Sequence, residues 1–233
     1  MAELQAIVFD LDDTLYPERQ YVASGFGAVS RWVEDRTGTS SKTTFVELQD
    51  LFDAESRSHT FDAWLNLHGL EPARFLGSMI QIYRGHDPVI RPFDGAERLL
   101  QSLHERCRLG LVSDGALEVQ KRKLEALGLR QHFDSIIFSD ELGRRFWKPS
   151  TVPFSNVLSG LGSPPYLAVY IADNPAKDFL GAKEVGMRTI RCRHPQGLHF
   201  EVDPPSSTHA AELEIRSLSE IIGALEHLEP MGR

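Results

Sequence analysis

The chain has 233 residues, a net charge of -8 and 41% hydrophobic residues, which is typical of a soluble globular protein with one large domain or one domain carrying an insert. The negative charge argues against a nucleic-acid-binding surface, and no apolar run approaches the roughly 20 residues that span a membrane. The only cysteines, Cys107 and Cys192, are read as free thiols of a reducing compartment. Because the chain enters its first strand without room for a signal peptide, we expect a cytoplasmic protein that binds neither nucleic acid nor membrane.

The first predicted element is a buried strand that ends in carboxylates. Residues 4–9 are largely apolar and lack Gly and Pro, which predicts a strand covered on both faces. Side chains alternate along a strand, so Asp10 and Asp12 are expected on the same side, with Leu11 in the core. Because neighbouring carboxylates repel each other, a divalent cation, a shared proton or both must compensate for their charge.

Residues 17–90 show the three- to four-residue hydrophobic spacing of helices and no convincing strand. The first of these helices is predicted to end near Gly38, the third near Gly69, and the fourth to begin at Pro72. We interpret the stretch as an insert after the first strand. The predicted domains are therefore a core of residues 1–16 and 91–233 and a helical domain of residues 17–90. The predicted helices of the insert cover residues 18–36, 43–54, 61–67 and about 72–83.

From residue 93 onward, strand-like and helix-like segments alternate, which predicts an α/β fold with a doubly wound, mostly parallel sheet. Residues 193–209 are rich in Pro, Ser and His and are predicted to form an exposed loop with solvated histidines. Ser217 and Glu220 fit a capping box that opens a last helix. The predicted strands are residues 109–112, 135–138, 167–172, 187–192 and 213–215, and the predicted helices are residues 95–106, 116–127, 152–159, 177–185 and 217–228.

Polar side chains follow three of these strands at their ends: Asp10 and Asp12, Ser113 and Asp114, and Asp173 and Asn174. Ligands bind beyond the carboxyl ends of the strands in such sheets, so we expect these side chains to meet at one edge. Taken alone, most of these residues, and Lys148 as well, also fit a purely structural role. Residues 113–114 could cap the following helix, residues 173–175 could form an ordinary turn, and Lys148 could be a surface lysine.

The chemistry of the combined cluster is that of a metal and phosphate site. Several carboxylates close together are best held by a hard divalent cation, with Mg²⁺ the natural candidate. Ser113 and the backbone N–H groups of the next helix would bind an anion. Lys148 would balance the charge of a phosphate and of a nucleophile. The carboxylates concerned are Asp10, Asp12, Asp13, Asp173 and Asp178.

These residues resemble, in order, the four motifs of the haloacid dehalogenase-like (HAD) superfamily. Asp10-Leu-Asp12-Asp-Thr14 is similar to the first motif, Ser113 to the second, and Lys148-Pro149 to the third. Asp173-Asn-Pro-Ala-Lys-Asp178 is similar to the acidic fourth motif. The resemblance spans residues 5 to about 192 and implies a HAD-type Rossmann-like core. The insert lies where the family carries its helical type 1 cap. Ala172, where the family often has Gly, and the Trp-Lys-Pro-Ser form of the third motif are small departures.

The resemblance also implies roles for the individual residues. Asp10 is the expected nucleophile, which forms an aspartyl-phosphate, and Asp12 is the expected general acid and base. We expect charged neighbours to raise the pKa of Asp12, so that this carboxyl starts protonated. Mg²⁺ is expected on Asp10, the backbone carbonyl of Asp12 and Asp173. Ser113, Asp114 and Lys148 are expected at the phosphate, and Asp178 in support of the metal. Thr14 and Asn174 are further supporting residues.

The sequence thus predicts a Mg²⁺-dependent phosphatase for a small phosphorylated metabolite, such as a sugar phosphate or a nucleotide-like compound, working as a monomer or homodimer. The alternatives are a phosphomutase, a haloacid dehalogenase, a phospho-accepting signalling module and an idle binding protein. Asp12 argues against dehalogenation, which needs no general acid. The cap would choose the substrate. Its polar or aromatic candidates are Tyr16, Arg19, Arg57 and His59, each of which also fits a surface or packing position.

Overall fold

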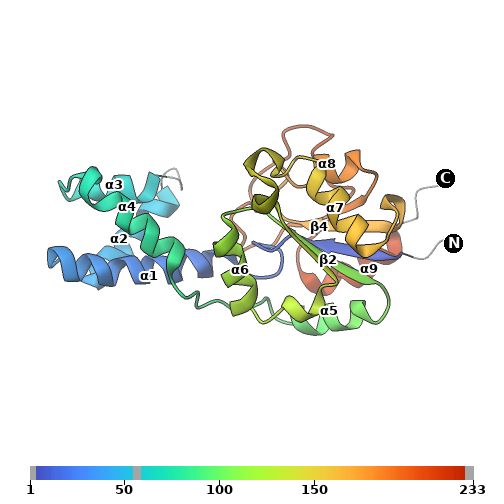
Figure 1. Cartoon of the computed structure of the whole chain (residues 1–233), viewed down its shortest axis with the longest axis horizontal. Helices are drawn as coiled ribbons and strands as arrows, with labels where there is room; N and C mark the ends of the chain where they lie inside the picture. Colours follow the sequence, from blue (N-terminus) through green and yellow to red (C-terminus); the bar gives the residue numbers. More distant parts are fainter. Residues whose placement is uncertain (1–3, 55–58, 229–233) are drawn as a thin grey trace. The chain divides into compact units, whose positions relative to one another are not determined.

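The computed structural model describes residues 4–54 and 59–228. Arg57 lies outside the described residues. The chain divides into two compact units, one made of Met1–Glu18 with Arg91–Arg233 and the other of Arg19–Ile90. The first, the sheet unit, carries all the strands of the described residues, and the second, the helical unit, carries helices (Figure 1). No helix in the part of the chain that the structure describes is long and apolar enough to cross a bilayer.

The sheet unit is built on six strands in the order β3-β2-β1-β4-β5-β6, and every neighbouring pair is parallel. The predicted α/β class with a parallel sheet is therefore confirmed. Strands β1 and β4 lie side by side in the middle of the sheet and are buried along their whole length, as their unbroken apolar sequences require. The strands are β1 Ala6–Phe9, β2 Arg108–Ser113, β3 Ser135–Phe138, β4 Ala168–Ala172, β5 Arg188–Cys192 and β6 Leu213–Ile215.

Helices α7 and α8 cover one face of the sheet, and α5 and α9 cover the other (Figure 1). Val8 of β1 packs with Phe154 and Val157 of α7 in one buried cluster. Helix α8 approaches the loop before α7 so closely that a Cβ on Gly181 would lie 2.2 Å from the carbonyl oxygen of Pro149. This contact sets the loop that carries Lys148 against α8. The helices are α5 Ala96–His104, α6 Leu117–Ala126, α7 Val152–Leu161, α8 Phe179–Glu184 and α9 Ile221–His227.

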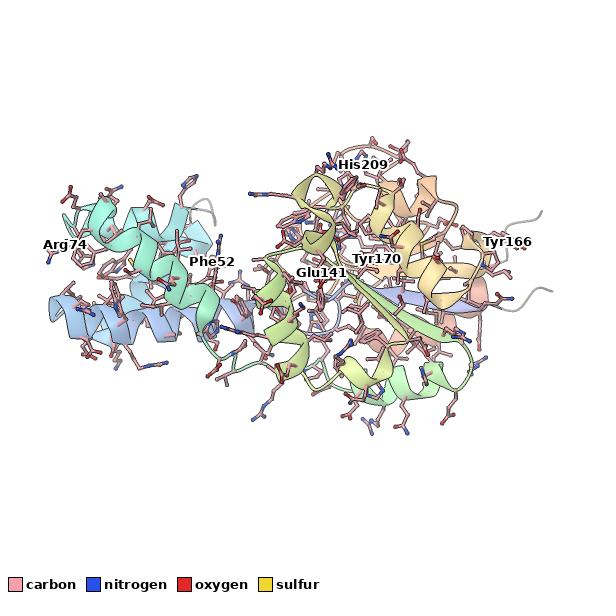
Figure 2. The ribbon with its side chains drawn as sticks, viewed as in Figure 1. Phe52, Arg74, Glu141, Tyr166, Tyr170 and His209 are labelled. Carbon is pink, nitrogen blue, oxygen red and sulfur yellow. The ribbon has the colours of Figure 1, made fainter. Side chains whose placement is uncertain are left out.

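The helical unit has an aromatic interior. Phe26 lies at the centre, with its ring centroid 5.9 Å from that of Phe52 and 5.8 Å from those of Phe61 and Tyr83. Phe52 projects from α2 (Figure 2). The rings of Phe52 and Phe61 meet that of Phe26 edge to face, an arrangement that stabilises a core beyond the area it buries. The four predicted helices all form: α1 Glu18–Thr37, α2 Ser41–Ala54, α3 Thr60–Leu67 and α4 Pro72–Gly85.

The loop after β5 is exposed in part, as predicted, but the stretch around Leu198 is packed against the rest of the sheet unit. Leu198 is 8% exposed, and its N–H donates to the Asp13 carboxylate at 2.6 Å. Arg191, which is 1% exposed, donates to the carbonyl oxygens of His199 (2.8 Å) and Val202 (2.7 Å). A buried guanidinium needs acceptors, and the loop backbone supplies them. The loop histidines His194, His199 and His209 are accordingly half-buried.

The last helix also begins differently from the prediction. Glu220 accepts from the Arg216 N–H at 3.2 Å, but the Ser217 hydroxyl donates to the Glu220 carboxylate instead of capping a backbone N–H. A reciprocal capping box is therefore absent. The first turn, Leu218–Glu220, is a 3₁₀ helix that leads into α9.

Candidate active site

The strand order changes direction at β1, whose carboxyl end carries Asp10. The chain runs outward from β1 to β2 and β3 and then returns to β4 on the other side of β1. The strand order reverses between β1 and β4, and ligands of open α/β sheets bind at such a point. Asp10 follows β1 directly and Asp173 follows β4 directly, so both carboxylates stand at this switch point. The register Phe9 to Ile171 places the two strand ends level with each other.

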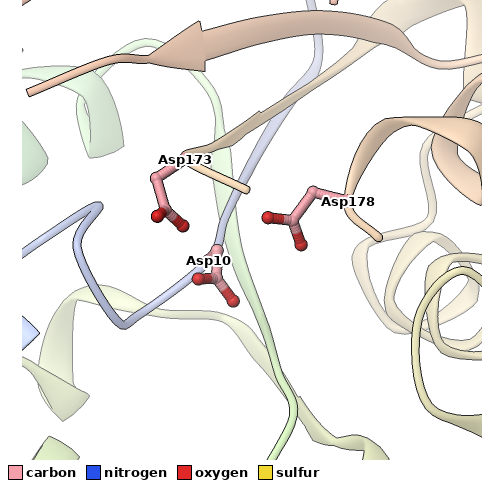
Figure 3. A group of neighbouring side chains, drawn as sticks. All are labelled: Asp10, Asp173 and Asp178. Carbon is pink, nitrogen blue, oxygen red and sulfur yellow. The ribbon is translucent and has the colours of Figure 1, made fainter. Parts of the chain in front are cut away.

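Asp10, Asp173 and Asp178 point toward one another (Figure 3), and each offers an oxygen within 4.8 Å of those of the other two. Their exposed fractions are 3%, 6% and 0%. The Oδ2 atom of Asp173 is buried without a hydrogen-bond partner among the described residues. Three buried carboxylates with an oxygen to spare fit a hard divalent cation, whose preferred ligands are oxygens. The residues that the sequence assigned to a metal through their side chains, Asp10 and Asp173, are both in this cluster.

The pKa values of the carboxyls in this cluster also indicate a cation site. Burial, together with the charge of Asp178, raises the pKa of Asp10 to about 6, although Lys148 acts against the rise. Burial and the charges of Asp178 and Asp10 raise the pKa of Asp173 well above its ordinary value. Carboxyls with raised pKa values are groups whose ionised form lacks sufficient positive partners. A bound cation would stabilise both ionised carboxylates and so lower both pKa values.

Lys148 places a positive charge in direct contact with two carboxylates of this cluster. Its Nζ lies 2.6 Å from Oδ1 of Asp10, 2.6 Å from Oδ1 of Asp178 and 3.0 Å from the hydroxyl of Tyr170. Lys148 is only 5% exposed, so the alternative of a surface lysine is wrong. Burial lowers the pKa of Lys148, but the two carboxylates outweigh burial and raise it well above the ordinary value. Conversely, burial raises the pKa of Asp178, but Lys148 and Lys177 outweigh it and hold that pKa low.

The side chain of Asp12 has its polar partners on α6 and in the segment that follows β1. Its Oδ1 accepts from Lys123 Nζ at 2.7 Å and from the Tyr16 hydroxyl, and its Oδ2 accepts from Gln120 Nε2 at 3.0 Å. Burial raises the pKa of Asp12, but Lys123 and these hydrogen bonds outweigh burial and lower it. The expectation that charged neighbours raise this pKa is therefore wrong. The nearest charge is a cation on α6, which the spacing of the acidic motif does not reveal.

Two hydroxyls near the strand ends have no hydrogen-bond partner among the described residues. Ser113 is 1% exposed and Thr14 is fully buried, and the side-chain oxygen of each is without a partner. An unpaired buried hydroxyl is costly unless a ligand or water completes it. Ser113 ends β2 beside β1, which is a suitable place for a donor to an anion bound there.

Asp114 and Asn174 serve chiefly to hold the loops. The carboxylate of Asp114 accepts from the Lys148 N–H at 3.3 Å and lies 3.7 Å from Lys177 Nζ, so it helps to hold the loop that carries Lys148. Residues 113–114 do not cap α6, since Asp140 accepts the Leu117 N–H at 3.0 Å. The Asn174 N–H donates to Asp178 Oδ2 at 2.9 Å, which orients a carboxylate of the cluster.

Sequence reasoning missed several residues around the site. Tyr170 lies on β4 in the sheet unit (Figure 2) and is the one polar side chain of that apolar strand, a signal that could have identified it. Lys123 and Gln120 are three residues apart, which places them on one side of α6, but nothing in the sequence couples them to Asp12. Tyr16, proposed as a substrate-selecting residue, is fully buried, and its hydroxyl bonds Asp12.

Comparisons with known proteins agree with this geometry. The profile of the haloacid dehalogenase-like hydrolases matches residues 7–192. A glyceraldehyde 3-phosphate phosphatase of Methanopyrus kandleri is 28% identical over 235 residues, which cover 97% of this chain and 98% of that protein. The fold is that of the magnesium-bound HAD-hydrolase YfnB of Bacillus subtilis (TM-score 0.68, 21% identity, 96% and 99% of the two chains). It is also that of a 2-haloacid dehalogenase of Pseudomonas syringae (TM-score 0.64, 20% identity, 96% and 98%). With the family profile covering most of the sheet unit and all four motifs, the chain belongs to the haloacid dehalogenase-like hydrolases.

Proposed function

We propose that the protein is a Mg²⁺-dependent phosphatase that hydrolyses a small phosphomonoester through an aspartyl-phosphate on Asp10. The observation that carries the proposal is the position of Asp10. Its carboxylate stands at the switch point of the sheet, 2.6 Å from Nζ of Lys148 and beside the carboxylates of Asp173 and Asp178. A nucleophile placed beside a cation and a metal-binding group is suited to attack an anionic phosphorus centre.

The first step would be attack by a carboxylate oxygen of Asp10 on phosphorus. Lys148 and the Ser113 hydroxyl would hold phosphoryl oxygens, since Ser113 has a buried oxygen with no other partner among the described residues. Asp10, Asp173 and the backbone carbonyl of Asp12, with Asp178 beside them, would hold Mg²⁺. Bound there, the ion would neutralise charge on the phosphoryl group.

Asp12 would complete the reaction as acid and base. Because Lys123 and its hydrogen bonds lower the pKa of Asp12 in the free protein, Asp12 would take up a proton as the anionic substrate binds beside it. It would give that proton to the leaving oxygen and then take a proton from the water that hydrolyses the aspartyl-phosphate. A halide leaves without a proton, so a carboxylate at this position favours phosphoryl transfer over dehalogenation. A phosphomutase would use the same groups, and the naming of a full-length relative as a phosphatase favours hydrolysis.

The substrate would be a small phosphorylated metabolite. The relative from Methanopyrus kandleri is named for glyceraldehyde 3-phosphate, a three-carbon sugar phosphate. We propose that the helical unit, residues 19–90, acts as the substrate-selecting cap, because it is inserted shortly after Asp10, between β1 and β2. Small sugar phosphates and nucleotides should therefore be better substrates than folded phosphoproteins.

The test is phosphate release by the purified protein from an aryl phosphate and a panel of phosphorylated metabolites. Release should require Mg²⁺, stop on chelation with EDTA and return when Mg²⁺ is added in excess. Asp10→Asn should show no turnover above background while keeping the wild-type circular dichroism spectrum. Turnover by that variant would refute the nucleophile assignment, and halide release from a 2-haloacid without phosphatase activity would favour the dehalogenase.

A further inference from the structure

The side chain of Asp12 sits in a cradle of three donors that no motif of the family match accounts for: Lys123, Gln120 and Tyr16. We propose that Lys123 is a positioning residue of the reaction, which orients the Asp12 carboxylate and stabilises the negative charge that develops there as its proton passes to the leaving group. The proposal rests on the phosphatase function inferred above. It adds a residue of α6 to a site otherwise built from the ends of strands and the loops that follow them.

The burial of Lys123 is the first argument. Helix α6 carries Lys121 and Lys123 two residues apart, and they behave differently. Lys121 has a side chain that is 44% exposed and forms surface pairs with Glu118 (3.9 Å) and Glu141 (3.4 Å). Lys123 has a side chain that is 4% exposed, and its Nζ lies 2.7 Å from Asp12. Burying an ammonium group is costly, so a lysine that only serves solubility would remain at the surface.

The convergence of donors is the second argument. Both oxygens of Asp12 are engaged, Oδ1 by Lys123 and Tyr16 and Oδ2 by Gln120. Gln120 is itself held, because its Nε2 also donates to the Asp114 carbonyl oxygen at 2.6 Å. Donors fixed in advance around a group that becomes charged lower the barrier without reorganising during the reaction. They also fix the direction in which the carboxyl presents its proton.

The path of the Asp12 proton through the two steps of the reaction defines the role of Lys123. In the first step Asp10 forms a bond to phosphorus, the bond from phosphorus to the leaving oxygen breaks, and Asp12 gives that oxygen its proton. Asp12 is then a carboxylate, and Lys123 stabilises it while keeping all its own protons. In the second step water attacks phosphorus, Asp12 takes a proton from that water, and the bond from phosphorus to Asp10 breaks. Asp12 ends protonated and ready for another turnover.

This role makes a prediction that depends on the leaving group. An alkoxide must be protonated as it leaves, whereas a dinitrophenolate leaves readily as an anion. Loss of Lys123 should therefore slow the first step for an alkyl phosphate and leave that step nearly unchanged for a dinitrophenyl phosphate. The second step needs Asp12 with either substrate. A dinitrophenyl phosphate should consequently give a burst of dinitrophenolate in the first turnover, followed by a slow steady state.

The experiment compares Lys123→Met with Lys121→Met, its exposed neighbour on the same helix, in rapid-mixing assays with Mg²⁺. For Lys123→Met we expect the single-turnover rate with glycerol phosphate to fall about 100-fold, at the low end of the effect of a general acid. The burst rate with dinitrophenyl phosphate should stay within about threefold of wild type, while its steady-state rate falls about as much as the glycerol phosphate rate. Lys121→Met should match wild type in all three measurements.

Two further variants keep the test decisive if Lys123→Met is poorly folded. Lys123→Arg retains a cationic donor and should lose less activity on glycerol phosphate than Lys123→Met. In an Asp12→Asn background, Lys123→Met should cause no further loss, because two groups that act as one unit are not additive. The proposal would be overturned if the burst rate with dinitrophenyl phosphate fell as much as the single-turnover rate with glycerol phosphate. An equal loss in the Arg and Met variants, or a full further loss in the Asp12→Asn background, would also overturn it. Failure of the phosphatase function would appear separately, as a wild-type protein that releases phosphate from neither substrate.

Discussion

The two units of the protein bury different kinds of side chain. At the strand ends of the sheet unit, three carboxylates and one lysine are packed together with almost no exposure: Asp10, Asp173, Asp178 and Lys148. In the helical unit the interior is aromatic, centred on Phe26, and the ion pair of Arg19 with Asp53 lies at the surface with side chains 48% and 54% exposed. Buried charge costs stability, whereas buried aromatic surface supplies it.

The difference indicates a division of labour between the units. A chain retains an expensive cluster of buried charges where chemistry needs them, because perturbed pKa values gather at functional sites. The helical unit has no comparable cluster among its described residues. We therefore expect substitutions in the sheet unit to act on the reaction, and substitutions inside the helical unit to act on folding or on the choice of substrate.

The largest effect is expected for Lys148→Met in the sheet unit. The change removes the Nζ that lies 2.6 Å from both Asp10 and Asp178 and leaves two buried carboxylates without their cation. Turnover of an aryl phosphate should fall about 10²- to 10³-fold, the loss typical of one charge-stabilising donor. Steady-state kinetics with saturating Mg²⁺ measures this. Lys177→Met removes a lysine whose side chain is 35% exposed and lies 3.7 Å from Asp114. This variant should lower turnover less than Lys148→Met. The assignment fails if the two variants lose equal activity.

A smaller effect is expected for Tyr170→Phe. The hydroxyl accepts from Lys148 at 3.0 Å and donates to Asp178 at 3.3 Å, and the ring packs edge-on against Phe154. The substitution keeps the ring and removes only the hydroxyl. We expect turnover to fall about tenfold, which corresponds to roughly 1.4 kcal/mol. Phe154→Leu changes the same cluster without touching the hydrogen bonds. It should lower the free energy of unfolding and leave turnover nearly unchanged, and a larger kinetic effect for Phe154→Leu would contradict this role of the hydroxyl.

In the helical unit, Trp64→Phe should affect stability and spare the chemistry. Trp64 is fully buried, donates from Nε1 to Glu47 at 2.8 Å and stacks on His68 with ring centroids 4.2 Å apart. Losing the donor should cost about 1–3 kcal/mol of the free energy of unfolding. Urea denaturation measures this cost. Turnover of a small aryl phosphate should remain within about twofold of wild type. A loss of turnover as large as that of Tyr170→Phe would show that the helical unit takes part in the reaction itself.

The smallest effect is expected for Arg19→Ala at the surface of the helical unit. The Arg19 Nη1 lies 2.6 Å from Asp53 Oδ1, but both side chains are about half exposed, and water and salt weaken such a pair. The free energy of unfolding should change by less than about 1 kcal/mol, measured in the same urea experiment. Activity on aryl phosphate should not change. If Arg19 selects substrates, KM for particular metabolites will rise while stability stays the same.

Much of the site could be predicted because its residues follow strands. Asp10, Ser113 and Asp173 come directly at or after the ends of apolar runs, and parallel strands bring their carboxyl ends to one edge. The partners of Asp12 could not be predicted in this way. Lys123 and Gln120 lie more than 100 residues along the chain from Asp12, on a helix whose three adjacent basic residues look alike in the sequence. Only the packing of α6 in the folded protein shows that Lys123 is buried and Lys121 is exposed.

The loop after β5 also shows a feature that the sequence alone did not predict. Its composition is that of a solvated segment, yet Arg191 and Asp13 bond its backbone and draw Leu198 inside. Composition reports the average behaviour of residue types, whereas a single buried guanidinium can recruit a loop to satisfy its donors. Sequence periodicity therefore placed the elements well, and composition misjudged the exposure of the stretch around Leu198.

The sequence by itself determined the alternation of strands and helices, the helical insert, and the strand ends at which charged groups would gather, because these follow from local periodicity and from the spacing of the motifs. The tertiary structure decided which charges pair. It joined Lys148 to Asp10 and Asp178, turned Asp12 toward Lys123, and thereby lowered a pKa that the motif alone suggested would rise. The physical reason is that the energy of a charge depends on its burial and its nearest partners in space, and neither is encoded in its neighbours along the chain.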